Sequence, residues 1–271
     1  MSLENVAITD AEFARFQALI YQIAGISMSD SKKVLLTGRL GKRLRYYGFD
    51  SYSEYYRFVS SDKEKGELQI MVDLLTTNET YFFREEKHFE FLATEILPKH
   101  PPGVAFNVWS AASSSGEEVY TLAMVLAERF GLSGNWTVIG SDVSQRMLAA
   151  GERGIYPIER TRGIPQEYLQ KYCLKGVRSQ EGMLLIEKAV RRHTRFLQVN
   201  LNQRLPDLGP FDLIFLRNVM IYFDNETKRK VVARLVQKLS PGGYFIVGHS
   251  ESLNGVTDAL RSVRPTIYMK P

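Results

Sequence analysis

The chain has 271 residues, of which 44% are hydrophobic and 24% charged, the balance of an ordinary globular protein of about two domains. This composition excludes wholesale disorder, a collagen-like repeat and a coiled-coil rod. The net charge of +5 is too small to indicate a nucleic-acid partner unless the basic residues are clustered.

Three features of the sequence bear on where the chain acts. It has no run of about 18 apolar residues, so a membrane span is not expected. Residues 1–6 lack the basic and apolar segments of a secretory leader. The single cysteine, Cys173, cannot form an internal disulfide, which is typical of a reducing compartment. We therefore expect a cytoplasmic protein.

The N-terminal part predicts helices only. A capping box at Thr9–Glu12 precedes apolar residues at helical spacing, a second helix is expected from Asp30, and another capping box at Ser51–Glu54 predicts a third. We expect an all-helical domain over residues 1–75 and a linker over residues 76–103.

From residue 104 to the end, predicted strands alternate with predicted helices. This rhythm favours parallel βαβ units and an open α/β sheet, which binds ligands beyond the carboxyl ends of its strands. Residues 160–190 break the rhythm and predict a small inserted β-hairpin. The predicted strands are 104–110, 136–141, 211–217, 244–248 and 266–269, and the predicted helices are 115–130, 144–152 and 226–239.

The turn after the first predicted strand, Trp109–Glu118, is rich in small residues but lacks the glycine fingerprint of dinucleotide-binding folds. Glu117 and Glu118 would repel a pyrophosphate at the helix start and suit a ligand with positive charge, such as an amino group and a sulfonium. Glu118 is better explained as a helix cap with Ser115, whereas Glu117 is the stronger candidate for a ligand contact.

Two further positions each have two interpretations. Asp142 ends the second predicted strand, where a carboxylate can bind both ribose hydroxyls or cap the next helix. Arg84 ends the polar and aromatic segment Asn78–Arg84, where it can form a fork to a ligand carboxylate or an inter-domain salt bridge.

Later strand ends give weaker signals. Asn200 and Leu201 could recognise an adenine edge. Tyr222 follows the predicted strand 211–217, where it could orient a reacting group or simply pack in the core. That strand end lacks the [Asp/Asn]-Pro-Pro-aromatic motif of amino-directed nucleic-acid methyltransferases.

Other chemistries find little support in the sequence. Gly248–Ser252 is similar to a nucleophile elbow but lacks its closing glycine, so a hydrolase is a poor fit. The four histidines and Cys173 show no metal-ligand spacing, so no metal site is expected. The histidines are His88, His100, His193 and His249.

The basic residues are clustered after all. Six lysines and arginines, and no acidic residue, lie between Ser31 and Phe49. Such a run is usually a solvated face, and here an acidic protein surface or a nucleic acid is also open as partner. Its members are Lys32, Lys33, Arg39, Lys42, Arg43 and Arg45.

Four segments together resemble the chemotaxis receptor methyltransferases, the CheR family, over nearly the whole chain. They are Asn78–Arg84, Trp109–Glu118, Arg217–Phe223 and Gly248–Ser252. The resemblance implies a helical N-terminal domain joined to a Rossmann-like methyltransferase domain with a small inserted antiparallel β-subdomain. It also implies transfer of a methyl group from S-adenosylmethionine to glutamate side chains of chemoreceptors, which gives glutamate methyl esters and S-adenosylhomocysteine.

The resemblance also implies roles for particular residues. Arg84 and Tyr222 would lie beside the transferred methyl group, and the basic helix would face the acidic helical bundle of the receptor through Lys32, Arg39, Lys42, Arg43 and Arg45. The residues implied to hold the cofactor are Asn78, Thr80, Arg84, Glu117, Asp142, Asn200, Leu201, Arg217 and Asn218.

The resemblance leaves open whether the inserted subdomain binds a second part of the receptor. Some family members use a glycine-containing loop there to bind a pentapeptide at the receptor's C-terminal tail. The corresponding loop here is Gly176–Gly182, and its Arg178 and Ser179 depart from the loops expected to bind. Two other functions also remain open, a regulatory module that binds S-adenosylmethionine without transferring its methyl group and an RNA methyltransferase that uses the basic helix.

Overall fold

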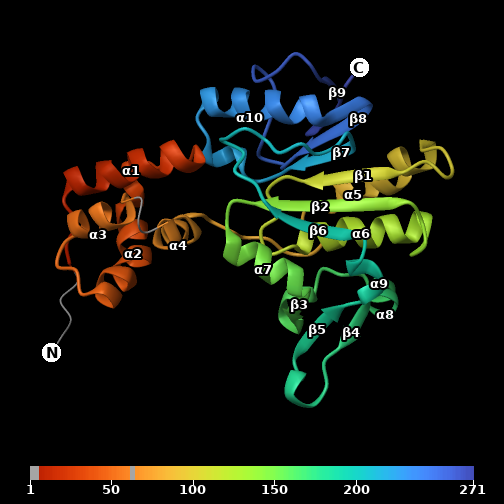
Figure 1. Cartoon of the computed structure of the whole chain (residues 1–271). Helices are drawn as coiled ribbons and strands as arrows, with labels where there is room; N and C mark the ends of the chain where they lie inside the picture. Colours follow the sequence, from red (N-terminus) through yellow and green to blue (C-terminus); the bar gives the residue numbers. More distant parts are fainter. Residues whose placement is uncertain (1–5, 62–64) are drawn as a thin grey trace. The chain divides into compact units, whose positions relative to one another are not determined.

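The computed structural model describes residues 6–61 and 65–271 (Figure 1). The chain forms two compact units, which we call the helical unit (residues up to 77, with 222–227) and the sheet unit (78–221 and 228–271). The expectation of no secretory leader rests largely on residues 1–5, which lie outside the described residues. Across the two described ranges, no helix has the length and apolar character needed to cross a membrane.

The helical unit begins with α1 (Asp10–Ala24), and its predicted capping box forms. The Thr9 hydroxyl accepts a hydrogen bond from the Glu12 amide at 3.2 Å, and the Glu12 carboxylate accepts one from the Thr9 amide at 2.9 Å. The helix expected at Asp30 starts as a short 3₁₀ turn that leads into α2 (Lys33–Tyr47).

Two shorter helices complete this unit, α3 (Tyr52–Val59) and α4 (Lys65–Leu75). Only half of the capping box predicted before α3 forms. The Ser51 hydroxyl accepts from the Glu54 amide at 3.2 Å, but the Glu54 carboxylate accepts from the amide of Asp50 instead of Ser51.

A buried carboxylate holds the helices of this unit together. Glu67 of α4 is 3% exposed and accepts hydrogen bonds from Arg43 at 2.6 and 2.8 Å, from Tyr47 at 3.0 Å and from Tyr55 at 2.8 Å. Burial alone would raise the pKa of Glu67, but these donors lower it. The ionised carboxylate therefore links α2, α3 and α4.

The sheet unit contains a seven-stranded sheet with the strand order β6-β2-β1-β7-β8-β10-β9. The five strands β6, β2, β1, β7 and β8 are parallel, and β10 is antiparallel to β8 and β9. The strands are β1 (Phe106–Ser110), β2 (Trp136–Asp142), β6 (Thr194–Gln198), β7 (Phe211–Leu216), β8 (Leu239–Val247), β9 (Arg261–Arg264) and β10 (Ile267–Met269).

Helices flank this sheet, and its central strands are buried. Val108 of β1 and Leu213 of β7 are neighbours in register and both are 0% exposed. The helices of the sheet unit include α5 (Lys87–Phe91), α6 (Glu117–Phe130), α7 (Gln145–Arg153) and α10 (Asn225–Lys238), of which α10 begins within the helical unit.

A separate three-stranded antiparallel sheet, ordered β3-β5-β4, lies between α7 and β6 along the chain. It begins at residue 155, slightly before the predicted insertion. Its elements are β3 (Ile155–Pro157), α8 (Gln166–Tyr172), β4 (Cys173–Lys175), β5 (Met183–Ile186) and α9 (Lys188–Arg191). The predicted α/β class, the all-helical N-terminal part and the small antiparallel insertion are thus confirmed.

Both edges of the large sheet carry arginine. Arg195 lies on the edge strand β6, and Arg261 and Arg264 lie on the opposite edge strand β9; all three side chains are exposed.

Candidate functional site

The carboxyl ends of β1, β2 and β7 meet where the strand order reverses. The chain runs outward from β1 to β2 and β6, and then returns to β7 on the other side of β1. Ser110, the last residue of β1, is in register with Gly140 of β2 and Phe215 of β7. Ligands of open α/β sheets bind at such a switch point, and the segments that follow these strands carry predicted site residues.

The turn between β1 and α6 is tightly built. Ser114 and Gly116 adopt left-handed backbone conformations, with φ of 47° and 93°. A Cβ atom at Gly116 would lie 3.0 Å from the backbone of Gly151 and from the ring of Phe196, so the turn requires glycine there.

The capping box considered for Glu118 does not form, which corrects that alternative. Helix α6 is preceded by Gly116, which has no side chain to cap it. Glu118 instead accepts a hydrogen bond from the Ser110 hydroxyl at 2.7 Å and pairs with Arg217.

Asp142 anchors the end of β2 to this turn. One carboxylate oxygen accepts from the Ser114 amide at 2.9 Å, and the other accepts from the Ser144 amide at 2.9 Å. Ser144 is itself the N-cap of α7, with its hydroxyl accepting from Met147. The alternative of Asp142 as the helix cap is therefore wrong. These bonds fix the carboxylate in place, and its two oxygens are of the kind that suits a diol.

Glu117, the first residue of α6, is a fully buried carboxylate with 0% exposure. The Ser115 hydroxyl donates to it at 2.7 Å, and Arg160 forms an ion pair with its other oxygen. Burial raises the pKa of Glu117 against the opposing effect of these donors. A buried carboxylate with little water around it strongly favours a cationic partner.

Arg217, just after β7, lies in a buried ion cluster. Its side chain is 1% exposed, and its guanidinium pairs with Glu118 at 2.8 Å and with Glu85 at 3.0 Å. It also donates to the backbone carbonyl of Arg84 at 2.5 Å. Burial would raise the pKa of Glu85, but the hydrogen bond from Asn218 and the charge of Arg217 lower it. Arg217 was predicted to contact cofactor, and in the structure its guanidinium joins two carboxylates.

The segment from Asn78 to Arg84 is held by its backbone carbonyls. The Asn78 carbonyl accepts from the Ser114 hydroxyl at 3.0 Å, and the Thr80 carbonyl accepts from Arg160 at 3.2 Å. The Arg84 guanidinium donates to the Glu79 carbonyl at 2.8 Å. The first predicted site residues are thereby brought beside the turn before α6.

The following residues are strained. Phe83 and Glu85 have φ of 57° and 59°, a region that non-glycine residues rarely adopt. Such conformations cost about 1–3 kcal/mol each and persist only where surrounding contacts hold them. Here the Phe83 amide donates to the Thr121 hydroxyl at 3.1 Å, and Glu85 is held by Arg217 and Asn218.

Asn200 and Leu201 follow β6. The side-chain oxygen of Asn200 accepts from the Asn202 amide at 2.9 Å, and the buried Leu201 offers its carbonyl to Arg234 at 3.0 Å. Asn218, with φ of 57°, donates its side-chain amide to Glu85 at 3.0 Å. The structure therefore places Asn200 and Leu201 after β6, two strands from β1, and Asn218 in the ion cluster after β7.

Tyr222 is grouped with the helical unit. It is half-buried, and its backbone carbonyl accepts from the Ser27 amide at 2.8 Å. The side chain of Arg39 lies in the same unit and donates to the carbonyls of Leu75 and Thr76 at 3.0 Å each.

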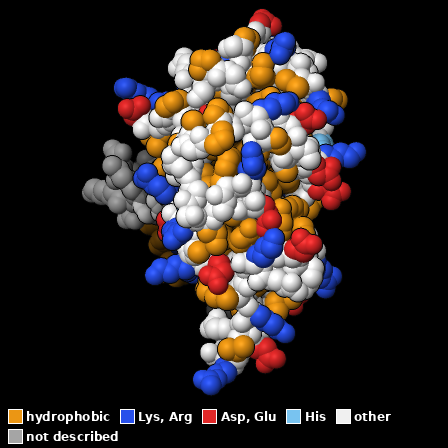
Figure 2. All heavy atoms as spheres, turned by 90° about the vertical axis from the view of Figure 1, so that its right-hand side faces the viewer, with side chains coloured by type: hydrophobic (Ala, Val, Ile, Leu, Met, Phe, Trp, Pro, Cys, Tyr) orange, Lys and Arg blue, Asp and Glu red, His pale blue; other side chains and the backbone are white. Residues whose placement is uncertain are grey.

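The members of the basic cluster are used differently, and Lys33 pairs with Asp10 of α1 at 2.6 Å. The guanidiniums of Arg39 and Arg43 are used inside the helical unit, on backbone carbonyls and on Glu67 respectively. Lys32, Lys42 and Arg45 are exposed. By contrast, the face of the sheet unit seen in Figure 2 intersperses cations, anions and hydrophobic side chains.

Glu251 has an important role that the sequence did not predict. Its buried carboxylate accepts from the amides of Gly248, Asn218 and Met220 at 2.7, 2.8 and 2.7 Å. The segment that is similar to a nucleophile elbow therefore fixes the loop after β7 to the loop after β8. A glutamate three residues after a strand-ending glycine was the available signal.

Folding also brings together Glu85, His88 and His249, whose ligand atoms lie within 4.8 Å of one another. Burial and the charge of Arg217 lower the pKa of His88 to about 3, so His88 is neutral at pH 7. The Glu85 oxygen in this group already accepts from Arg217 at 3.0 Å and from the His249 amide at 3.1 Å. Those donors compete with any cation for the same oxygen.

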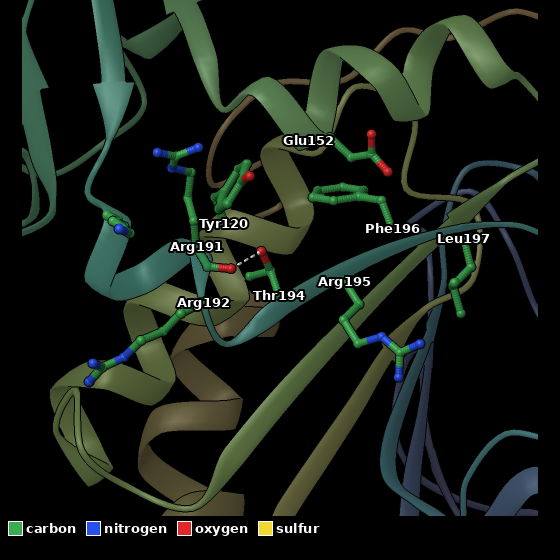
Figure 3. A pocket seen from close by; sticks show the side chains of 9 residues that line it. Tyr120, Glu152, Arg191, Arg192, Thr194, Arg195, Phe196 and Leu197 are labelled. Carbon is green, nitrogen blue, oxygen red and sulfur yellow. Dashed lines mark hydrogen bonds between the residues drawn. The ribbon is translucent and has the colours of Figure 1, made fainter.

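A cavity of about 550 Å³ lies elsewhere, beside β6 and α9 (Figure 3). Arginine side chains line it, but Figure 3 shows those of Arg191, Arg192 and Arg195 pointing in different directions. Arg191 and Arg192 donate to the carbonyls of Ile186 and Leu132. None of the residues predicted to hold the cofactor lines this cavity.

Comparison with known proteins identifies this arrangement of sheet and site. Residues 78–269 match the family model described as the CheR methyltransferase SAM-binding domain, and residues 11–76 match the CheR methyltransferase all-alpha domain. The fold and site thus define an S-adenosylmethionine-dependent methyltransferase.

Relatives match over almost the whole chain. It is 37% identical to the chemotaxis protein methyltransferase of Escherichia coli and 36% identical to that of Salmonella typhimurium, in each case over 98% of this chain and 92% of the relative. It is also 37% identical to chemotaxis protein methyltransferase 2 of Pseudomonas aeruginosa, over 96% of this chain and 93% of that one. The chain belongs to the CheR methyltransferase family.

The residues at the strand ends fit S-adenosylmethionine. Asp142 suits the ribose diol, and Glu117 suits the cationic amino group or sulfonium. The Ser113 hydroxyl, in the same turn, is buried and has no hydrogen-bond partner among the described residues, which leaves a donor for a ligand.

Proposed function

We propose that this chain transfers the methyl group of S-adenosylmethionine to glutamate side chains in the cytoplasmic helical bundle of chemoreceptors, in chemotaxis adaptation. The products are glutamate methyl esters and S-adenosylhomocysteine. The observation that carries the proposal is the pair of fixed carboxylates, Asp142 and Glu117, on either side of a glycine turn at the switch point. The family supplies the acceptor.

In this proposal the strand ends hold the cofactor, and the segment Asn78–Arg84 completes the site. Asp142 binds the ribose hydroxyls, Glu117 binds the amino group, and Asn200 with Leu201 contacts the adenine. Asn78 and Thr80 lie beside the same turn. Arg217 and Asn218 act through the ion cluster that holds the Arg84 segment.

The chemistry needs no general base. The cofactor supplies an electrophilic methyl group on a positively charged sulfur. A glutamate acceptor with a pKa of about 4.3 is already ionised at pH 7, so no proton has to be removed from it. The protein's task is then to bring the carboxylate into line and exclude water, and such positioning is worth about 7–11 kcal/mol in favourable systems.

We assign this positioning to Arg84 and Tyr222. Arg84 lies in the strained segment after Asn78, and its guanidinium can form a two-point contact with a carboxylate. Arg84→Ala should lower the methylation rate at saturating cofactor by about 100-fold or more, with cofactor affinity changed much less. Arg204→Ala, an exposed change outside the site, serves as control. An unchanged rate would remove Arg84 from the mechanism.

The receptor would meet the helical unit through the exposed cations Lys32, Lys42 and Arg45 of the basic cluster. Arg39 and Arg43 would support that surface from within. A second contact, between the receptor's C-terminal pentapeptide and the loop Gly176–Gly182, is tested by methylating receptors with and without the last five residues.

The direct test of the function is incubation with S-adenosylmethionine labelled in its methyl group and receptor-bearing membranes. Glutamate methylation predicts label that mild base releases from the receptor as methanol. Base-stable label, or label in added RNA whose binding weakens steeply with salt, would instead support an RNA methyltransferase. Cofactor binding without transfer to any acceptor would support a regulatory module.

A further inference from the structure

Arg160 lies beside the buried carboxylate of Glu117. It belongs to the 3₁₀ turn Ile158–Thr161, which follows β3 in the inserted subdomain. Its Nη2 atom pairs with Oε1 of Glu117, and the same nitrogen donates to the Thr80 carbonyl at 3.2 Å and to the Ser115 hydroxyl at 3.4 Å. One nitrogen of the guanidinium is therefore anchored at the turn before α6.

The backbone that carries Arg160 is fixed against the same turn. The Tyr156 hydroxyl donates to the Ser115 carbonyl at 2.7 Å, and the Tyr156 ring packs edge-on against that of Phe82, with ring centres 5.0 Å apart. A Cβ atom at Gly163 would overlap the carbonyl oxygen of Phe82, so the chain on the other side of Arg160 also packs closely. The Arg160 side chain, which is 43% exposed, thus extends from a well-held base.

Two nitrogens of Arg160 are left for a ligand. Within residues 6–61 and 65–271, neither its Nε nor its Nη1 atom has a hydrogen-bond partner. A guanidinium carries five N–H donors in a planar fork, and two of them can bind one carboxylate at once. Oε1 of Glu117 is also buried and accepts no hydrogen bond from a described residue, although Arg160 pairs with it. A group that can bind an anion and a group that can bind a cation therefore lie side by side.

We propose that Arg160 binds the α-carboxylate of S-adenosylmethionine, so that Glu117 and Arg160 together recognise the two charges of its amino-acid end. This inference rests on the proposed function, in which Glu117 binds the amino group. The amino and carboxylate groups of an amino acid are attached to the same carbon atom, so the residues that bind them have to be neighbours. Glu117 and Arg160 meet this condition.

Two other arginines of the site are less suited to this carboxylate. Arg217 is 1% exposed, and its guanidinium is already shared by two carboxylates. Arg84 donates to the Glu79 carbonyl at 2.8 Å, and among the described residues no hydrogen bond or ion pair joins its side chain to Glu117. Arg84 therefore stays available for the carboxylate of the methyl acceptor.

Charge balance gives the inference a specific consequence. With a zwitterionic ligand, the two charges of the pair meet two opposite charges, and the buried site stays neutral. A ligand that keeps the amino group but lacks the carboxylate would place its ammonium beside Arg160 and Glu117 and leave one positive charge in excess. Arg160 should therefore favour the first ligand and disfavour the second.

The test compares two such ligands by isothermal titration calorimetry. They are S-adenosylhomocysteine and its decarboxylated analogue, which keeps the amino group. The wild type should bind S-adenosylhomocysteine about 10-fold or more tightly than the analogue. Arg160→Met should raise the dissociation constant for S-adenosylhomocysteine about 10- to 100-fold. Its dissociation constant for the analogue should stay the same or fall, because Arg160 no longer competes for Glu117.

Two further variants act as controls. Arg162→Met, an exposed change two residues along the chain, should alter neither dissociation constant. Arg160→Lys keeps the charge but loses the fork, so its preference for S-adenosylhomocysteine should lie between those of the wild type and Arg160→Met. The ratio of the two constants is measured in the same protein, so it does not depend on the folded fraction of a sample.

Each outcome bears on the inference. Equal weakening of both ligands in Arg160→Met overturns it, because Arg160 would then act only through Glu117 or through the fold. An unchanged preference in Arg160→Met also overturns it. Loss of the preference in Arg84→Met instead overturns it in favour of Arg84. In these three cases the proposed function stands if the wild type methylates the receptor. A wild type that binds S-adenosylhomocysteine but methylates no receptor counts against the proposed function, and a preference that is lost with Arg160 still supports the inference.

Discussion

Replacement of Arg217 by methionine separates two roles for this residue, a contact with the cofactor and a charge that neutralises the buried carboxylates. Methionine has similar length and no charge. In the variant, Glu85 and Glu118 lose a guanidinium at 3.0 and 2.8 Å, and their side chains are only 12% and 13% exposed. Removing one partner of a buried ion pair costs about 3–5 kcal/mol because the remaining charge is left without compensation.

That cost is large compared with the whole stability of a domain, about 5–15 kcal/mol. For a domain of this size it corresponds to a fall in melting temperature of about 6–20 °C. Differential scanning calorimetry measures the fall, and Arg204→Met, an exposed change outside the sheet, is the control, expected to change stability by about 0.5 kcal/mol or less.

The pH dependence gives an independent check. Arg217 helps to lower the pKa of Glu85 against the effect of burial. Without Arg217, burial should raise that pKa above the unfolded value of about 4.3. A raised pKa adds stability at low pH that is lost as the pH rises, so the deficit of Arg217→Met should be smaller at pH 5 than at pH 8.

A loss below about 1 kcal/mol at pH 8, together with a large loss of S-adenosylmethionine affinity, would refute this reasoning. Arg217 would then be a cofactor ligand and the ion cluster would contribute little.

Two further predictions concern single carboxylates. Glu117→Gln should raise the dissociation constant for S-adenosylmethionine about 10- to 100-fold by calorimetry. Because burial raises the pKa of Glu117, wild-type binding should also weaken as the pH falls, starting at a higher pH than for a glutamate of ordinary pKa, whereas binding by the variant should not. An affinity of the wild type for S-adenosylmethionine that does not change when Glu117 is protonated would contradict the role given to Glu117. Glu67→Gln should cost about 2–4 kcal/mol in urea denaturation at pH 7; because the pKa of Glu67 is lowered on folding, the deficit should shrink as the pH falls below about 4.5, and a deficit that grows there would contradict the role given to Glu67.

The elements were largely predictable because their signals are local. Buried apolar runs placed β1, β2 and β7 to within two residues at either end, and the capping box at Thr9 gave the start of α1. The main differences were β6 and β9, where short strands on the sheet edges carry arginines that interrupt the apolar pattern.

The contacts of the site were less predictable, because they join residues far apart in sequence. Glu118 resembled a helix cap, but it pairs with Arg217, 99 residues away. The cap of α7 shows the opposite case, since Ser144 was available in the sequence as an alternative to Asp142, and the structure shows Ser144 in that role. His88 and His249 are likewise far apart in the sequence, so their spacing did not indicate that the fold brings them together.

The arginines at the two edges of the sheet have a consequence for handling this protein. An open edge offers unpaired amides and carbonyls to any other strand, and a charged side chain on it makes strand addition from a second molecule unfavourable. Arg195, Arg261 and Arg264 therefore disfavour strand addition at the two edges of the sheet. Truncations, surface-neutralising mutations and fusions intended to improve expression should leave these three charges in place.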